Sequence, residues 1–236
     1  YAREVLGAAV TKNKEYLKSV VEPVADASVS FPDTFIDTPD DERLITRGAR
    51  PWWRIQPCTI ALLTHPGVPM LYMGCEYAED DRTRFANGLP RELNPLDWEQ
   101  SEATGPLLRL HRALGFLRRL LPALRGPGFT PLWRHEAERM LVYGRGEGTP
   151  EVIVALNFSD EAQLVRVPAP GPDADWHEFL FNLKFVSRGG AMHFHGADDH
   201  VHTRILVPGC YAHIYCRARH WSDDTWRDLF ARDRYP

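Results

Sequence analysis

Apolar residues follow two different spacings along the chain, and the change falls near its middle. Before residue 126 they recur every three or four positions in three stretches, a spacing that predicts helices. These stretches cover residues 3–22, 50–63 and 105–121. Two short apolar runs, residues 34–37 and 68–73, are bounded by proline or glycine and predict strands. Because strands that alternate with helices usually lie parallel in one sheet, this half predicts an α/β arrangement.

After residue 126 the chain consists of short apolar runs separated by turn residues. The runs cover residues 140–143, 152–158, 164–167, 176–181, 191–194, 200–207 and 211–216. Regular short strands of this kind are typical of an antiparallel sandwich, which we expect over residues 126–218. The tail, residues 219–236, is charged, and Trp226, Leu229 and Phe230 stand in it at helical spacing. We expect a short helix there.

Composition and charge exclude several classes of protein. The 236 residues carry 28 Lys and Arg against 32 Asp and Glu, a balance that argues against a nucleic-acid partner. The longest apolar runs are far shorter than the ~20 residues of a membrane helix, so no membrane partner is expected. Four cysteines lie far apart without a CxxC motif, namely Cys58, Cys75, Cys210 and Cys216. We expect free, buried thiols, a reducing compartment and a cytoplasmic location.

Three groups of residues invite a functional interpretation that we do not favour. His193, His195, His200 and His202 alternate along the chain, but they lack a tight metal-ligand spacing and are expected to be solvated. Trp53 and Trp133 are expected in the core rather than on a sugar-stacking surface. Four arginines of the last predicted helix are expected on its solvent-facing side. They are Arg109, Arg112, Arg118 and Arg119.

Two polar segments stand where catalytic groups lie in an α/β barrel, just past the carboxyl ends of strands. Residues 38–43 read TPDDER and follow the first predicted strand, and residues 74–81 read GCEYAEDD and follow the second. Acidic residues also fill turns and cap helices, so residue type alone leaves the question open. Two strands cannot close a sheet, so residues 1–125 are predicted to be part of a larger structure.

Four segments resemble the α-amylase superfamily, in the order that the family shows. ALLTHPGVPMLYMGCEY (61–77) resembles the final barrel strand with its helix, and NPLDWE (94–99) the loop that follows. LLRLHRALGFLRRLLPALRG (107–126) resembles the last barrel helix, and VIVALNFS (152–159) a strand of the domain after the barrel. The resemblance implies an α/β TIM-barrel portion over residues 1–125, with the last two strands and their flanking helices. An all-β antiparallel sandwich follows over residues 126–218.

One subgroup of this family is similar at the first predicted strand. Most members have Asn-His-Asp there, whereas this chain has Thr38-Pro39-Asp40. That is similar to the Asn-Thr-Pro-Asp of maltosyltransferases, which extend α-1,4-glucans from maltose 1-phosphate, although Asp37 stands in place of the Asn. RGARPWWRI (47–55) is also similar to this subgroup. From residue 64 onward the chain resembles ordinary amylases and branching-type enzymes, so the subgroup stays open.

The resemblance also implies a mechanism and a set of site residues. Retaining members use an Asp nucleophile, a Glu acid/base and a second Asp that stabilises an oxocarbenium-like transition state. Only the last of these maps onto this chain, at Asp40. Around it, substrate-binding residues at the barrel mouth are expected to be Thr38, Asp41, Arg43, Glu76 and Tyr77. No metal or organic cofactor is expected.

Two hypotheses of function follow. In the first, the chain is the C-terminal section of a retaining enzyme acting on α-1,4-glucans or malto-oligosaccharides, by transfer or hydrolysis. An N-terminal barrel portion or partner chain would then supply the other carboxylates. In the second, the chain is a catalytically inactive remnant that serves as a structural or glucan-binding subunit. Under both hypotheses the chain alone is expected to be inactive.

Overall fold

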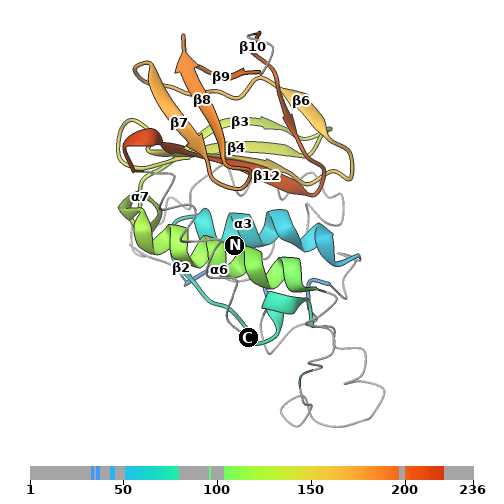
Figure 1. Ribbon diagram of the computed structural model, residues 1–236. Helices are drawn as coiled ribbons and strands as arrows, with labels where there is room; N and C mark the ends of the chain where they lie inside the picture. Colours follow the sequence, from blue (N-terminus) through green and yellow to red (C-terminus); the bar gives the residue numbers. More distant parts are fainter. Residues whose placement is uncertain are drawn as a thin grey trace.

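The computed structural model has a layer of helices on one side of a large antiparallel β structure (Figure 1). It describes residues 33–34, 36–37, 43–45, 51–79, 96, 104–196 and 200–220. The helix predicted over residues 3–22 and the tail helix predicted around Trp226 lie outside the described residues.

The helical layer contains one fully buried helix and one amphipathic helix. Its elements are η1 (Trp52–Ile55), α3 (Gln56–Thr64), α6 (Gly105–Leu120) and α7 (Pro122–Arg125). In α3 every residue from Pro57 to Thr64 is buried, because this helix packs against α6 and against strands β5 (Val152–Asn157) and β12 (Tyr211–Arg217). The amphipathic α6 is buried only along one side, as its periodicity predicts. Trp53 differs from its prediction, since 47% of it is exposed in η1.

The second half folds into one eight-stranded sheet and one two-stranded sheet, and all pairings in both are antiparallel. The large sheet has the order β10-β9-β8-β7-β12-β5-β4-β3, and the small one pairs β11 with β6. The other bounds are β3 (Phe129–His135), β4 (Met140–Arg145), β6 (Gln163–Val165), β7 (Ala174–Glu178), β8 (Leu183–Arg188), β9 (Ala191–His195), β10 (Val201–His202) and β11 (Ile205–Val207). Figure 1 shows β7, β8 and β9 lying over β3, β4 and β12, so the large sheet bends back over itself. The predicted antiparallel character is therefore confirmed, in a bent sheet with a small second one.

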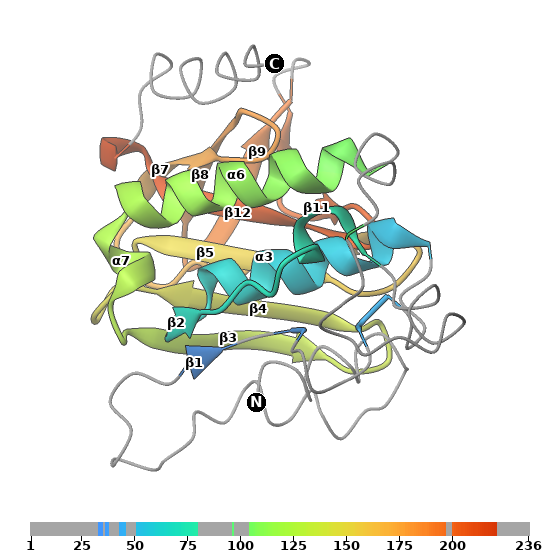
Figure 2. The same cartoon turned by 90° about the horizontal axis from the view of Figure 1, so that it is seen from below.

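Alternate residues of the central strands enter two different cores. In β5, Val152, Val154 and Leu156 belong to the core shared with α3 and α6, whereas Ile153 and Ala155 belong to the core inside the bent sheet. Figure 2 shows α3 and α6 lying across the sheet face that β4, β5 and β12 form. Burial on both faces explains why β5 reads as a continuous apolar run rather than an alternating one.

Several strands differ from the pattern that predicted them. The single strand expected over residues 200–207 is two strands, since β10 pairs with β9 and β11 pairs with β6 in the other sheet. Strands β3 and β8 were not predicted. Strand β3 is an edge strand with a register shift between Pro131 and Trp133, a place where proline is tolerated.

The second predicted strand is present in shortened form, whereas the first lies earlier in the chain and shares only Thr34 with the predicted residues 34–37. Strand β1 (Asp33–Thr34) pairs in parallel with β2 (Val68–Pro69), with Asp33 opposite Val68 and Thr34 opposite Pro69. The apolar run beyond Pro69 does not continue as a strand, and its large apolar residues are exposed to a similar degree. The exposed fractions are 51% for Val68, 40% for Met70, 48% for Leu71 and 60% for Met73. We call these four residues the exposed apolar strip.

Arg145 connects the helices to the sheet through backbone carbonyls. It has no exposed surface, and its guanidinium donates to the carbonyls of Thr64 (2.7 Å), Leu124 (3.2 Å), Gly126 (2.7 Å) and Gly128. Thr64 ends α3 and Leu124 lies in α7. One β4 side chain therefore satisfies backbone carbonyls at both helix ends that have no donor within the helix. Burial lowers the Arg145 pKa to about 10, which still leaves it charged at neutral pH.

A second arginine acts on the same helix end. Arg118 of α6 donates to the carbonyls of Leu63 and His65, at 3.0 Å each, and to that of Gly67. The prediction that Arg118 faces solvent is therefore wrong, because the side chain covers the C-terminal end of α3. The chain turns at His65 and Pro66, and that turn leaves carbonyls that the helix cannot satisfy.

We expect Arg145→Met to lower the free energy of unfolding by about 3 kcal/mol or more. The substitution would leave several buried carbonyls without donors, and each such group costs about 1–3 kcal/mol. Urea unfolding of both proteins would measure the difference. Arg112→Met, at an exposed position of α6, is the matched control and should change stability by less than about 0.5 kcal/mol. Equal effects of the two substitutions would contradict this account of Arg145.

The buried ring of His65 predicts a loss of stability in mild acid. Burial, and then the charge of Arg145, lowers the His65 pKa to about 4, while the ring packs on Phe129 at 4.7 Å between centroids. The unfolded chain takes up this proton near the ordinary pKa of 6.5, so stability is full above pH 6.5 and falls as the pH drops toward 4. The His65 contribution to that loss should be at most about 3 kcal/mol.

His65→Phe removes the titrating group and keeps an aromatic ring in the same place. Urea unfolding at several pH values between 7.5 and 4.5 should show a smaller loss of stability in this variant than in the unsubstituted chain. Identical pH dependence of the two proteins would rule out His65 as the source.

Candidate functional site

The segments that follow β1 and β2 meet at Arg43. Its Nη2 donates to the carbonyl of Met73 at 2.8 Å, and its Nη1 lies 3.8 Å from Oδ2 of Asp37. The guanidinium also stacks over the Tyr72 ring, 4.5 Å from the centroid. Because β1 and β2 run in parallel, the chain leaves both strands at the same end of the pair, the end where their carboxyl termini lie. Arg43, in the first segment singled out by sequence, thus contacts Tyr72 and Met73, which directly precede the second segment.

Asp37 closes the segment that carries most of the predicted site residues. Its Oδ1 accepts a hydrogen bond from the backbone N–H of Leu44 at 2.8 Å, and the side chain is almost fully buried. The intervening chain contains Thr38, Asp40 and Asp41, which lie outside the described residues. Sequence reasoning noted Asp37 only as a departure from the family pattern. In the sequence, Asp37 stands at the end of an apolar run and six residues before Arg43. That position was the signal for the Asp37–Arg43 pair.

A turn at Gly74 places the second segment. Gly74 has φ +89°, and the N–H of Glu79 donates to its carbonyl at 2.9 Å. The short helix η2 (Cys75–Tyr77) lies inside this turn and ends at Ala78, which also has a positive φ. Thr104, at the start of α6, donates from its hydroxyl to the carbonyl of Tyr77 at 2.8 Å. The turn is therefore held both internally and from α6.

The three predicted binding residues that the structure describes have different environments. Arg43 is fully buried and Tyr77 is 1% exposed, whereas Glu76 is half-buried. Of these three, Glu76 alone keeps appreciable surface for a ligand. Arg43 is placed to hold Asp37 and the Met73 carbonyl in position, and Tyr72, which sequence reasoning missed, packs on its guanidinium. The described side chains can thus supply hydrogen-bond acceptors on a fixed backbone.

Cys75 lies in this region but is not a nucleophile. Burial, with added repulsion from Asp37 and Glu76, raises the pKa of its thiol to about 12, so it stays protonated at neutral pH. All four cysteines are buried and unpaired, as predicted. Burial also raises the pKa of Cys58 and of Cys216. The cysteines are packing residues in this fold.

The described residues contain neither a cluster of metal ligands nor a membrane-spanning helix. Within the described ranges, no group of three or more His, Cys, Asp or Glu side chains is placed to hold a metal ion. Among the helices that the structure describes, none is both long enough and apolar enough to span a bilayer. Of the alternating histidines, His193 and His195 lie in β9 and His202 in β10, where His202 lies opposite Phe194 and His195 opposite Val201.

One curated relative supports the resemblance in sequence. The α-1,4-glucan:maltose-1-phosphate maltosyltransferase 1 of Streptomyces coelicolor is 26% identical over 162 residues, which cover 64% of this chain and 24% of the relative. No protein-family model matches the chain. The chain therefore spans about a quarter of the length of this curated relative.

Solved structures support the resemblance in fold. An α-amylase from Geobacillus thermoleovorans, complexed with acarbose, has a TM-score of 0.65 at 21% identity, over 89% of this chain and 46% of that one. An Anoxybacillus α-amylase has a TM-score of 0.63 at 20% identity, over 89% and 44%. A pullulanase from Anoxybacillus sp. LM18-11 has a TM-score of 0.62 at 16% identity, over 89% and 31%. The chain has the fold of less than half of each of these proteins.

We expect Gly74→Ala to destabilise the fold by about 2 kcal/mol. A Cβ at this position would lie 2.7 Å from the Glu79 Cβ, and alanine also disfavours a positive φ. Gly115→Ala is the control, because it lies inside α6 with no heavy atom within 4 Å of the added Cβ. That control should stabilise the chain by about 0.5–1 kcal/mol. Thermal unfolding of both variants would measure the effects, and a stabilised Gly74→Ala would contradict the described turn.

Proposed function

From its resemblance to the α-amylase superfamily, we propose that this chain is the C-terminal section of a retaining enzyme acting on α-1,4-glucans. Residues 1–125 would form the last two strands of a TIM barrel with their flanking helices, and residues 126–218 the domain that follows. The observation that carries the proposal is the parallel β1–β2 pair, whose following segments meet through Arg43 and Asp37. In an α/β barrel, catalytic groups lie at the carboxyl ends of the strands, which is where these two segments begin.

Asp40 is the proposed transition-state stabiliser. Its carboxylate would accept hydrogen bonds from sugar hydroxyls, which strengthen as positive charge develops on the ring. Thr38, Asp41 and Glu76 would line the mouth around it. Arg43 and Tyr77 are buried in the described fold, so their proposed role is to position the backbone of the two segments rather than to present a side chain to the solvent.

Maltosyl transfer is the finer proposal for the reaction. It is supported by the Thr38-Pro39-Asp40 motif and by the Streptomyces coelicolor relative, whose name specifies maltose 1-phosphate and an α-1,4-glucan. The nucleophile and the acid/base would be supplied from outside this sequence, because only one of the three family carboxylates maps onto it.

An N-terminal barrel portion or a partner chain is the proposed covering for the exposed apolar strip. Within the described part of the chain, β1 and β2 pair only with each other, so their outer edges are open to a further strand. The strip carries four large apolar side chains with 40–60% of their surface exposed. Several large exposed apolar side chains in one short segment favour a surface that another protein segment covers.

Asp40→Asn tests the catalytic assignment in the polypeptide or complex that supplies the other two carboxylates. The substitution keeps the shape and removes the charge, so kcat should fall by about 10²–10³-fold, with a smaller change in KM. Glu42→Gln, two residues away, is the matched control and should leave kcat nearly unchanged. Steady-state kinetics with malto-oligosaccharides and with maltose 1-phosphate would measure both variants.

The isolated 236-residue chain should show no turnover on either substrate. Turnover by this chain alone would contradict the proposal that the other carboxylates lie outside it. A near-normal kcat for Asp40→Asn in the complete enzyme would end the assignment of Asp40. Loss of stability without loss of kcat would mean that Asp40 only caps its turn. A complete assembly that binds glucan without turnover would instead support the inactive-subunit alternative.

A further inference from the structure

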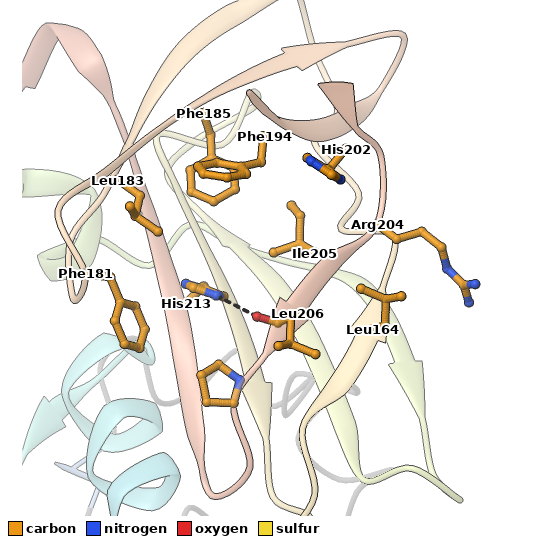
Figure 3. A pocket seen from close by; sticks show the side chains of 11 residues that line it. Leu164, Phe181, Leu183, Phe185, Phe194, His202, Arg204, Ile205, Leu206 and His213 are labelled. Atoms are coloured by element: carbon orange, nitrogen blue, oxygen red, sulfur yellow. Dashed lines mark hydrogen bonds between the residues drawn. The ribbon is translucent and has the colours of Figure 1, made fainter. Parts of the chain in front are cut away.

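An open cavity lies in the bent sheet, far along the chain from the segments around Arg43. Its volume is about 410 Å³, within the range of small-molecule sites in proteins. It lies between the small sheet and the β8, β9 and β12 strands of the large one (Figure 3). Its lining is Leu164, Phe181, Leu183, Phe185, Phe194, His202, Arg204, Ile205, Leu206, Pro208 and His213.

The body of the cavity is apolar and partly open to solvent. Phe185 and Phe194 pack on each other with centroids 5.1 Å apart, and Phe181 lies 5.1 Å from the His213 ring. Leu164 is 51% exposed and Leu206 is 57% exposed at its edge. The adjoining core, around Trp176 and Tyr215, is fully buried by comparison. An apolar ligand would remove this remaining surface from water.

The floor of the cavity offers little polar binding capacity. His213 is almost fully buried, and its Nε2 lies 3.1 Å from the carbonyl of Leu206. Its Nδ1 lies 3.4 Å from Oε1 of Glu178. Glu178 in turn accepts hydrogen bonds from the N–H groups of Leu180, Phe181 and Ile214. Both ring nitrogens thus face acceptors on the protein, and His213 presents its ring to the cavity.

Among the described lining residues, Arg204 carries the permanent charge. Arg204 and His202 are exposed at the edge, and none of the described residues that line the cavity is acidic. Figure 3 shows the Arg204 guanidinium extending outward beyond the apolar side chains. A ligand with its apolar part in the cavity would therefore place its other end near a positive charge. A sugar fits this lining poorly, because sugars need many hydrogen-bonding partners.

We propose that this cavity binds a small amphipathic anion, an aliphatic or aromatic carboxylate whose apolar part enters between Phe181, Phe194 and Leu206. Arg204 would pair with the carboxylate at the mouth. The site is separate from the proposed α-glucan site and does not depend on it. For a ligand of about ten non-hydrogen atoms, a roughly millimolar Kd is expected.

Saturation-transfer NMR titrations of the full chain with octanoate, 1-octanol and octylammonium test this assignment. Leu206→Ser should weaken the binding of octanoate and of 1-octanol by about five-fold, because it removes apolar contact. Met73→Ser is the matched control, since Met73 is 60% exposed and belongs to the exposed apolar strip. It should leave both affinities unchanged. Both substitutions are at exposed side chains, so the fold should tolerate them.

The charge is tested separately. Arg204→Gln should weaken octanoate about three-fold, as expected for an exposed ion pair, without changing the affinity for 1-octanol. Octylammonium should bind no more weakly to this variant than to the unsubstituted chain. Arg188→Gln, at an exposed arginine outside the cavity lining, should alter none of these affinities.

Three results would overturn the proposal. The first is no binding of octanoate at 10-fold the expected Kd. The second is binding that Met73→Ser reduces and Leu206→Ser does not, which would place the ligand on the exposed apolar strip. The third is an equal effect of Arg204→Gln on octanoate and on 1-octanol, which would remove the preference for an anion.

Discussion

The fold depends on finding donors for the backbone carbonyls where α3 and α7 end. Thr64 and Leu124 are fully buried at these ends, and two arginines donate to the carbonyls there. Arg145 reaches them from the sheet and Arg118 from α6. Tyr143 adds a hydroxyl contact of 2.6 Å to Thr64. Since a helix C-terminus carries partial negative charge, a buried guanidinium is stabilised there even without a carboxylate.

These contacts also set where the candidate site lies. The C-terminal end of α3 leads through His65 and Pro66 into β2, and β2 leads into the turn at Gly74. Fixing the end of the helix against β4 therefore fixes the start of the strand that carries Glu76. The Arg43–Asp37 contact then brings the segment after β1 to the same edge. The site geometry is a consequence of packing that begins in the sheet.

Sequence reasoning succeeded where one spacing dominated a segment. The leucines of α6 predicted its buried side, and the apolar runs predicted β4, β5 and β12 to within about two residues. It failed where tertiary contacts override local pattern. Strand β3 was not predicted, and β10 and β11 were merged into one run, although a bend at residues 203–204 separates them and each joins a different sheet. Arg118 looked solvent-facing because its spacing does not reveal the carbonyls that it meets.

The candidate site was predicted as two segments at one barrel mouth, but the contacts of Arg43 with Asp37 and with the chain at Tyr72 and Met73 were not predicted. Motif and position identified residues 38–43 and 74–81, but the burial of Arg43 and Tyr77 follows from neighbours that are distant along the chain. Trp53 shows the opposite error, since an aromatic residue was assigned to the core and is half exposed. Motif and position therefore proposed the segments, and packing decided which of their described side chains reach the surface.

The burial of β5 on both faces has a consequence for how this segment can be inherited. The secondary structure changes from helices to strands near Gly126, which suggests a domain boundary there. The residues of β5, however, alternate between the helical core and the core of the bent sheet. Recombination at that point would transfer a sheet with one apolar face uncovered. Recombination would therefore have to transfer the sheet together with the helices α3 and α6. Selection on either half of the chain then constrains the other half.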